Sequence, residues 1–349
     1  MSNKLSFSSD YMEGAHPEIL RRLLETNMEK TNGYGLDPYS ESAKEKIRAA
    51  CNCPDAEVNF LVGGTQTNAT VIDALLRSYQ GVLAPESGHI NTHEAGAIEF
   101  GGHKVLTLRQ KNGKITAEQI REALDAYNND ANHDHMVLPG MVYISQPTEY
   151  GTIYSLDELR NISKVCRENR IPLYVDGARL AYALACPEND VTLRDLAELC
   201  DVFYIGGTKC GALFGEAVVI PRPGTIPHFF TIIKQHGALL AKGRLLGLQF
   251  DTLFTDGLYE KIGQIAIDSA ARIRSALRDN GYQIYTETPT NQIFVLIDDD
   301  LMQRLSEKVN FGFWEKYDEN HTVIRFATSW ATAEEDVNQL IMLLSEYGA

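Results

Sequence analysis

Long apolar runs are missing from this sequence. No stretch reaches the ~18 apolar residues of a membrane-spanning helix, and residues 1–10 are polar, without the apolar core of a signal peptide. Basic residues are also in short supply, since 32 lysines and arginines stand against 47 aspartates and glutamates and the formal net charge is −15. We therefore expect a cytoplasmic protein whose main partner is neither a membrane nor a nucleic acid.

Cysteine is sparse and shows no metal-binding pattern. The six cysteines are scattered along the chain, and the single residue between Cys51 and Cys53 is not a usual zinc spacing. His89 and His93 are four residues apart and would share one face of a helix, but a zinc site needs further ligands. We expect reduced thiols and no bound metal.

Apolar residues are abundant enough for a sizeable core, at 44% of 349 residues. Because a single core seldom grows beyond ~250–300 residues, we expect two domains. Residues 15–250 alternate short apolar strands with helices, which indicates a large α/β domain. Residues 251–349, together with an irregular arm over residues 1–14, indicate a smaller α+β domain built on a mainly antiparallel sheet.

The periodicity of apolar residues predicts the individual elements. Strands of the large domain are predicted over residues 58–62, 81–84, 104–108, 142–145, 172–175, 202–205 and 216–220. Its helices are predicted over residues 17–28, 40–51, 64–79, 116–127, 155–169 and 231–250, with helical pieces between 178 and 199. A long helix over 258–280 leads to strands at 283–285, 292–297, 311–317 and 322–326, and to helices at 301–309 and 333–347.

Two of the predicted strands end in residues that carry chemistry. The strand before Gly206-Gly207-Thr208-Lys209 places a lysine among small residues, and lysine forms Schiff bases with carbonyl compounds. Taken alone, Lys209 fits a solvated surface charge equally well. The strand before Asp176 ends in Asp-Gly-Ala-Arg, where the aspartate is either a helix N-cap or a buried carboxylate.

The two strand ends gain meaning as a pair. Enzymes that use pyridoxal phosphate (PLP) need a lysine for the Schiff base and a carboxylate opposite the ring nitrogen. Lys209 follows Asp176 by 33 residues, enough for one helical crossover and a strand, so both would lie at the same edge of the sheet. The pair therefore favours a PLP site.

Other residues have a functional and a structural interpretation. Gly63-Gly64-Thr65 at a helix start offers free N–H groups to an anion, or is an ordinary cap. His89 is either stacked on a cofactor ring or held by structural hydrogen bonds. Arg325 alternates with apolar residues and is either a carboxylate clamp or an edge charge. The loop containing Tyr34 either packs on its own helix or reaches a neighbouring subunit.

Taken together, these motifs resemble the low-specificity L-threonine aldolases of the β-eliminating lyase group, which are fold-type-I PLP enzymes. The resemblance covers nearly the whole chain and implies a large, mainly parallel seven-stranded sheet with a smaller α+β domain. It rests on Tyr34-Gly35-Leu36-Asp37-Pro38, Gly64-Thr65-Gln66-Thr67-Asn68, His89 with Glu94-Ala95-Gly96, Val175-Asp176-Gly177-Ala178-Arg179, and Thr208-Lys209.

The resemblance also implies roles for individual residues. Lys209 would bind PLP covalently, while Asp176 would contact the ring nitrogen. The remaining cofactor contacts would come from His89 on the ring face, Arg179 at O3′, Thr208 beside the lysine, and Gly64 and Thr65 at the phosphate, helped by Lys234 or Lys242 of a neighbouring region. Substrate would be held by Ser9, Tyr34 and Arg325.

Two departures from the family pattern concern the chemistry. Thr208 stands where the main branch has serine, so a hydroxyl group is kept at this position. Glu149 stands where the main branch has a histidine near the substrate hydroxyl, so Glu149 becomes the candidate base. The implied reaction cleaves the Cα–Cβ bond of L-threonine, L-allo-threonine or a related β-hydroxy-α-amino acid, giving glycine and an aldehyde. The alternatives are β-elimination, transamination or an inactive PLP-binding protein. The family further implies a homodimer or homotetramer with shared active sites.

Overall fold

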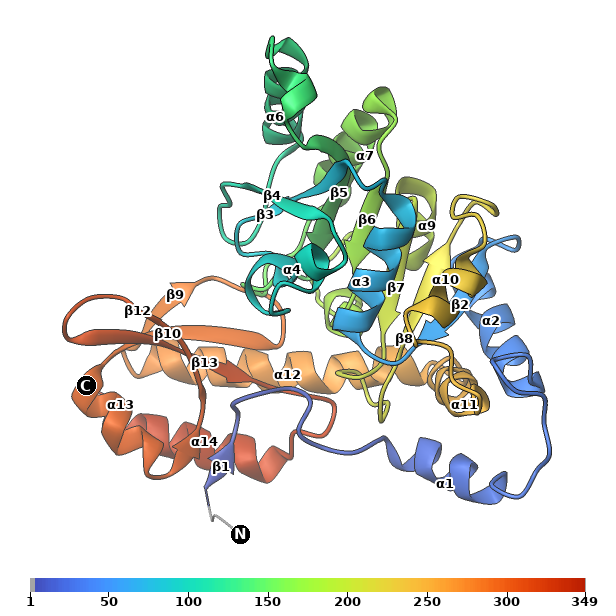
Figure 1. Ribbon diagram of the computed structural model, residues 1–349. Coiled ribbons are helices and arrows are strands. Elements are labelled where there is room, and N and C mark those ends of the chain that lie inside the picture. The colour runs from blue at the N-terminus through green and yellow to red at the C-terminus, as the bar shows by residue number, and fades with distance from the viewer. Residues whose placement is uncertain (1–3, 349) are drawn as a thin grey trace.

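Seven strands form one large sheet in the computed structural model, which describes residues 4–348. Their order is β2-β8-β7-β6-β5-β3-β4 (Figure 1). Neighbours from β4 to β7 are parallel, whereas β8 is antiparallel to both β7 and β2. Consequently the first residue of β8 lies at the edge where the other strands end. The strands are β2 (Glu57–Leu61), β3 (Gln80–Pro85), β4 (Lys104–Leu108), β5 (Leu138–Ser145), β6 (Leu173–Asp176), β7 (Val202–Gly206) and β8 (Glu216–Ile220).

Helices cover both faces of the large sheet, as the continuous apolar strands require. Every residue of β6 and β7 is buried. One face packs against α3 (Gly64–Leu75) and α10 (Phe229–Gln235) (Figure 1). The other packs against α7 (Leu156–Asn169) and α9 (Leu193–Leu199). The predicted start of α7 is confirmed, because Ser155 and Glu158 form a reciprocal capping box there.

A second, antiparallel sheet has the order β12-β13-β10-β9. It comprises β9 (Gln283–Thr286), β10 (Gln292–Asp298), β12 (Gly312–Lys316) and β13 (His321–Ala327), and packs with α13 (Asp299–Ser306) and α14 (Glu334–Tyr347). Figure 1 shows α12 (Leu258–Asp279) running from the large sheet to this one. Its first half packs in the large core and its second half in the small core, so the domain boundary at residue 250 stays a prediction.

The N-terminal arm is not wholly irregular, contrary to the sequence-based expectation. Strand β1 (Leu5–Ser6) pairs in parallel with β11 (Val309–Asn310), and the following Phe7 is fully buried against Phe326. The partner strand is about three hundred residues away, so local sequence gave no sign of it. Residues 1–3 of the predicted arm lie outside the described residues.

Four predicted helices are wrong in extent. Those expected over 17–28 and 301–309 end three residues early, at Glu25 and Ser306, and two others differ more. The helix expected over 231–250 is split into α10 and α11 (Arg244–Leu253), and Gly237 between them has φ +66°. The helix expected to reach residue 79 ends at Leu75. None of the helices within residues 4–348 has the length and apolarity to cross a bilayer. The remaining helices are α1 (Pro17–Glu25), α2 (Pro38–Ala50), α4 (His89–Thr92), α5 (Ala97–Phe100), α6 (Ala117–Asn129), the 3-10 helix η1 (His133–His135) and α8 (Leu180–Leu184).

Candidate active site

A cavity of about 660 Å³ lies at the carboxyl edge of the large sheet. Strand ends and helix starts of the large sheet form one side of it, and β10, β12 and β13 of the small sheet contribute the other. The cavity therefore lies where ligands collect in open α/β sheets. Its lining residues are Tyr11, Gly64, Thr65, His89, His93, Ser145, Pro147, Glu149, Asp176, Ala178, Arg179, Tyr204, Thr208, Lys209, Glu216, Gln292, Phe313, Trp314 and Arg325.

Lys209 lies in the turn after β7 and faces this cavity. Its amine is 5.9 Å from the centre of the Tyr11 ring. Burial, followed by the positive charge of Arg179, lowers the pKa of Lys209. A lowered pKa increases the share of the neutral amine, which is the form that attacks a carbonyl carbon. The structure thus gives Lys209 the surroundings of a nucleophile.

Asp176 ends β6 in a buried set of hydrogen-bond donors. Its Oδ2 accepts hydrogen bonds from the Tyr143 hydroxyl (2.7 Å) and Asn68 Nδ2 (3.0 Å), and its Oδ1 accepts one from the Ala178 N–H (3.0 Å). Burial would raise the pKa of Asp176, but the Tyr204 hydroxyl, the charge of His89, and the hydrogen bonds from Asn68 and Tyr143 lower it overall. The N-cap of α8 is Arg179, so the alternative interpretation of Asp176 as a helix cap is wrong.

A chain of hydrogen bonds links the Asp176 carboxylate to His89. Asn68 Nδ2 donates to Asp176 and also to Glu94 Oε1 (2.7 Å), and Glu94 Oε1 lies 2.8 Å from His89 Nδ1. The Glu94 side chain is fully buried. The imidazole is therefore held by a carboxylate at one nitrogen. The sequence showed Asn68 and Glu94 as motif residues, but not that they join these two groups.

Glu149 lies beside His89 and has one unsatisfied oxygen. Its Oε1 accepts hydrogen bonds from Ser145 Oγ (2.7 Å) and the His89 N–H (2.9 Å). Its Oε2 is buried and has no hydrogen-bond partner among residues 4–348. Burial raises the pKa of Glu149. A carboxyl group whose pKa is shifted toward neutrality, with one free oxygen, can exchange protons with a ligand.

Arg325 approaches the cavity from β13 of the small sheet. Its Nη1 donates to Gln292 Oε1 (3.0 Å) and its Nη2 to the Ser8 carbonyl oxygen (3.0 Å). Its Nε is buried without a partner in the described part of the chain. Ser9 is next to Ser8 but does not line the cavity, and its buried hydroxyl has no partner among the described residues either. Arg325 therefore offers a fixed cation to a carboxylate ligand.

Arg179 lines the cavity but is engaged by the N-terminal arm. Its Nε and Nη2 donate to Asp10 Oδ2 (2.6 Å) and Oδ1 (3.0 Å), and Asn291 Nδ2 donates to Asp10 Oδ2 (2.9 Å). Burial would raise the pKa of Asp10, but Arg179, Lys209 and these hydrogen bonds lower it to about 2. The pair thus holds Asp10 of the N-terminal arm against Arg179 of the cavity lining.

Replacing Asp10 with alanine is expected to lower the free energy of unfolding by about 3–5 kcal/mol, because Arg179 is left as a buried, unpaired cation. The pKa of Asp10 in the folded protein lies below its ordinary 3.8, so the stabilisation is complete above about pH 4 and is lost as the pH falls through about 2. Denaturant unfolding near neutral pH measures the loss. Asp134→Ala, with a side chain 92% exposed, is the control, and an equal effect of both variants would contradict the prediction.

The start of α3 presents the first-turn N–H groups of a helix to the cavity, where Gly64 and Thr65 are lining residues. Gly63 is the N-cap and provides no side-chain acceptor, and the first turn of α3 contains no acidic residue. A Cβ atom on Gly64 would lie 3.3 Å from the Tyr204 hydroxyl, so the close approach favours glycine. Thr65 and Thr208 add hydroxyl groups to the same lining. A helix start of this kind suits an anion.

Glu216 is a cavity residue that the sequence analysis missed. It is the first residue of β8 and only 3% exposed, and its Oε2 accepts a hydrogen bond from the Gly207 N–H (3.2 Å). Burial raises the pKa of Glu216 to about 8. Its one signal in the sequence is an acidic residue that opens an otherwise apolar strand.

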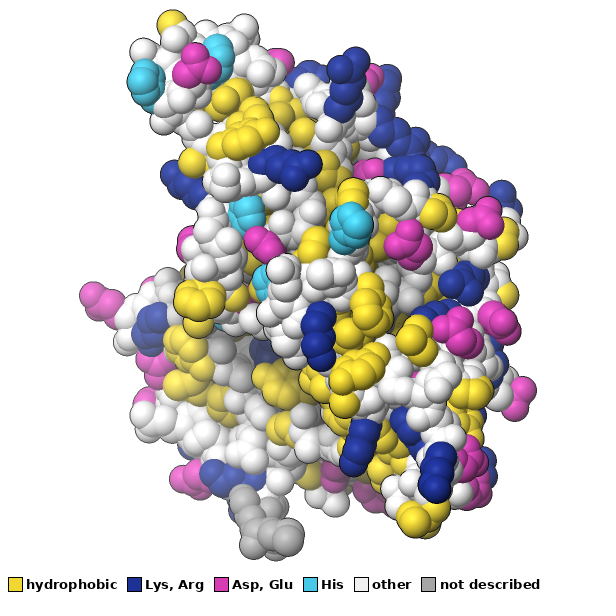
Figure 2. Space-filling view, turned by 45° about the vertical axis from the view of Figure 1, so that its right-hand side comes forward, with side chains coloured by type: hydrophobic (Ala, Val, Ile, Leu, Met, Phe, Trp, Pro, Cys, Tyr) yellow, Lys and Arg dark blue, Asp and Glu magenta, His cyan; other side chains and the backbone are white. Residues whose placement is uncertain are grey.

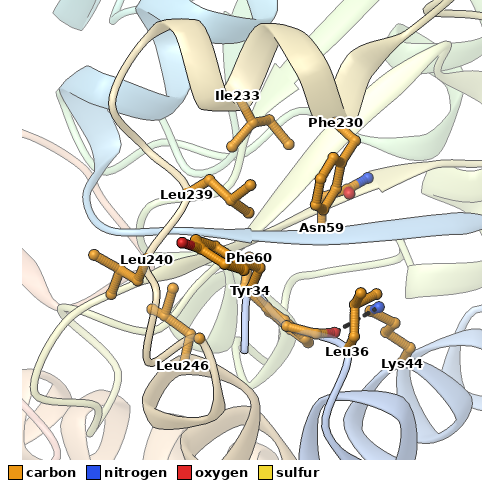
Figure 3. A pocket seen from close by; sticks show the side chains of 12 residues that line it. Tyr34, Leu36, Lys44, Asn59, Phe60, Phe230, Ile233, Leu239, Leu240 and Leu246 are labelled. Carbon is orange, nitrogen blue, oxygen red and sulfur yellow. Dashed lines mark hydrogen bonds between the residues drawn. The ribbon is translucent and has the colours of Figure 1, made fainter. Parts of the chain in front are cut away.

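Tyr34, Lys234 and Lys242 do not line the cavity of their own chain. Tyr34 borders a separate depression of about 60 Å³ between β2, α10 and α11 (Figure 3). Lys234 Nζ is 4.6 Å from the centre of the Tyr34 ring. Lys242 is in the loop next to Ala241, whose carbonyl oxygen accepts the Tyr34 N–H (3.2 Å). The structure thus gathers these three residues, but away from Lys209.

Comparisons with known proteins agree with this geometry. The model of the β-eliminating lyase family matches residues 6–300. A low-specificity L-threonine aldolase of a Pseudomonas species is 32% identical over 345 residues, covering 96% of this chain and 95% of that protein. A threonine aldolase structure from Leishmania major has a TM-score of 0.95 and 40% identity, covering 99% of both chains.

The fold predicted for the chain is confirmed as well. An aspartate aminotransferase structure from Thermus thermophilus, at 14% identity, has a TM-score of 0.72. The match spans 99% of this chain and 91% of the aminotransferase chain. At that identity the likeness concerns the fold alone, which is fold type I of the PLP enzymes. The family model covers most of the chain, and the chain belongs to the β-eliminating lyase family.

Proposed function

We propose that this protein is a PLP-dependent aldolase that splits β-hydroxy-α-amino acids, with L-threonine and L-allo-threonine as the first candidates, into glycine and an aldehyde. The observation that carries the proposal is the convergence of Lys209, Asp176 and the start of α3 on one cavity. The relatives named as threonine aldolases, which match this chain over nearly their whole length, support the same reaction.

The residues present fit PLP. Lys209 would hold its aldehyde carbon, the ionised Asp176 its ring nitrogen, and the N–H groups and hydroxyls of Gly64, Thr65 and Thr208 its phosphate. His89 would lie on the ring face and Arg179 at O3′. When bound, PLP supplies a protonated ring that withdraws electrons from the amino acid's α-carbon. Asp176 favours that charge because a nearby anion stabilises a cation.

The substrate would be oriented by the small sheet. Arg325 has a buried Nε without a partner among residues 4–348 and would bind the amino acid's carboxylate, with Ser9 and Tyr34 as further candidate contacts. Glu149 would accept the proton of the β-hydroxyl group on Oε2, which has no partner in the described part of the chain. The Cα–Cβ bond then breaks, the carbinol carbon leaves as an aldehyde, and the α-carbon takes up a proton to give glycine.

The deciding experiment is a substrate screen on the purified protein with PLP, in which glycine and aldehyde are both quantified. The proposal expects equimolar glycine and acetaldehyde from L-threonine or its allo isomer. Ammonia with an oxo acid would instead indicate β-elimination, and amino-group transfer to an oxo acid would indicate an aminotransferase. A protein that takes up PLP but releases no product from any of these substrates would be an inactive PLP-binding protein.

We further propose that the active site is completed across a two-fold interface. Figure 2 shows apolar side chains gathered, with lysine and arginine among them, on the face that carries α10 and α11. Tyr34, Leu36 and Phe230 at the depression of Figure 3 are 41%, 57% and 47% exposed. Exposed apolar clusters of this kind mark interaction surfaces. A second copy would bring Tyr34, with Lys234 or Lys242, to the partner's phosphate site.

Mixing Lys209→Ala chains with Tyr34→Ala chains is expected to restore activity, although each variant is nearly inactive alone. In a mixed dimer, one site has both Lys209 and the partner's Tyr34 intact, so random exchange yields about a quarter of wild-type turnover. The matched control mixes Lys209→Ala with Asp176→Asn, which alter the same cavity and leave no complete site. Absence of recovery after proven subunit exchange, or a fully active monomer in sedimentation, would contradict the shared site.

A further inference from the structure

Glu216 places a carboxyl group at the end of the cavity where the proposed function places a phosphate. Because β8 is antiparallel to β2, Glu216 pairs with Leu61, the last residue of β2. Leu61 is three residues before Gly64, which opens α3. The Gly207 N–H, which donates a hydrogen bond to Glu216, belongs to the turn that leads to Thr208 and Lys209. Glu216, the start of α3 and Thr208 therefore share one end of the cavity.

An ionised carboxylate would oppose a phosphate at this end, since like charges repel in a cavity of low dielectric. Among the described residues of its own chain, the cation that acts on Glu216 is Lys209. Burial raises the pKa of Glu216, as does the charge of Asp176, while the Thr208 hydroxyl, Lys209 and the Gly207 N–H lower it. The neutral hydroxyls of Tyr174, Tyr204 and Tyr259 and the thiol of Cys210 also lie within electrostatic reach, from β6, β7, α12 and the turn after β7. That cation, Lys209, is the residue that the cofactor itself would engage.

We propose that Glu216 binds the cofactor phosphate as a neutral carboxylic acid. One oxygen keeps the hydrogen bond from Gly207, and the protonated oxygen donates to the phosphate. The proton comes from solvent whenever Glu216 is ionised before binding, so PLP binding takes up a proton there and weakens at alkaline pH. This inference rests on the proposed function, because it takes PLP as the cofactor.

The protonation state of the free site agrees with this role. Burial raises the pKa of Glu216 to about 8, so the acid form predominates near neutral pH in the folded protein. Above that value the carboxylate forms, and each molecule of PLP must then bind together with one proton. The affinity of a ligand that requires one proton falls by about tenfold for each further pH unit.

The test compares PLP with pyridoxal, which lacks the phosphate, on wild-type protein and on Glu216→Gln. Full-length protein is stripped of cofactor, and each compound is titrated by absorbance between about pH 7 and pH 9.5. The ratio of variant to wild-type affinity for PLP is expected to rise by about tenfold per pH unit above pH 8, and to stay constant for pyridoxal. Glu149→Gln is the matched control, because it removes another buried cavity carboxyl. Its ratio of variant to wild-type affinity should change with pH in the same way for PLP and for pyridoxal.

A second measurement does not depend on a variant. Calorimetry of wild-type protein in buffers of different ionisation enthalpy should show more protons taken up with PLP than with pyridoxal, at about one pH unit above the pKa of Glu216. Equal proton uptake, or an affinity ratio that is constant with pH, would overturn the inference and leave Glu216 as a structural acceptor for Gly207. Failure of the wild-type protein to bind PLP would overturn the proposed function instead, so the two failures are distinguishable.

Discussion

Replacing Lys209 with alanine is expected to abolish covalent attachment of the cofactor and to reduce turnover by roughly a thousandfold or more, since each tenfold loss corresponds to only about 1.4 kcal/mol of transition-state stabilisation. The amine faces the cavity in the turn after β7, and its pKa is lowered by burial and by Arg179. Alanine leaves the cavity walls in place but removes the only nucleophile that the proposal assigns.

Borohydride reduction of the wild-type protein, followed by peptide mapping, measures the attachment directly. The pyridoxyl label should appear on the peptide containing Lys209 and vanish in the variant. Lys164→Ala is a suitable control, because that side chain is 71% exposed on α7, far along the chain from the cavity turn. A label on any other lysine would refute the assignment.

The strands that position Lys209 and Asp176 could be predicted from local sequence. Each is a short apolar run, one ending at Asp176 and the other at Gly206, three residues before Lys209, and parallel strands place such ends at one edge of the sheet. Two failures have different causes. The break between α10 and α11 contains Gly237 at positive φ, a local signal that the apolar periodicity hid, whereas β1 pairs with β11, which is distant in the sequence.

In the candidate site too, residues in local motifs could be predicted, whereas contacts between distant parts of the chain could not. Gly64, Thr65, His89, Glu149, Asp176, Arg179, Thr208, Lys209 and Arg325 were predicted and all line the cavity. The ion pair between Asp10 and Arg179 joins residues 169 positions apart, so no local pattern could reveal it. Glu216 was missed for a topological reason: only an antiparallel strand brings its first residue to the edge where parallel strands end.

Replacing Asp176 with asparagine is expected to leave PLP bound while lowering turnover by on the order of 10²–10³-fold, the scale seen when one electrostatic contact to a developing charge is removed. An amide does not stabilise a protonated ring nitrogen as a carboxylate does. The replacement is nearly isosteric, and the Tyr143 hydroxyl and Asn68 can still hydrogen-bond its oxygen, while the single hydrogen bond from the Ala178 N–H is lost; the fold should therefore persist.

The measurement therefore separates binding from chemistry. Absorbance of the bound cofactor and the midpoint of thermal unfolding should stay close to those of the wild type, while glycine formation falls. Asp157→Asn, whose side chain is 88% exposed on α7, makes the same chemical change outside the cavity and should keep full turnover. Near wild-type turnover in Asp176→Asn would show that the buried carboxylate serves only to hold Asn68 and Tyr143, and the electron-withdrawing role would have to be assigned elsewhere.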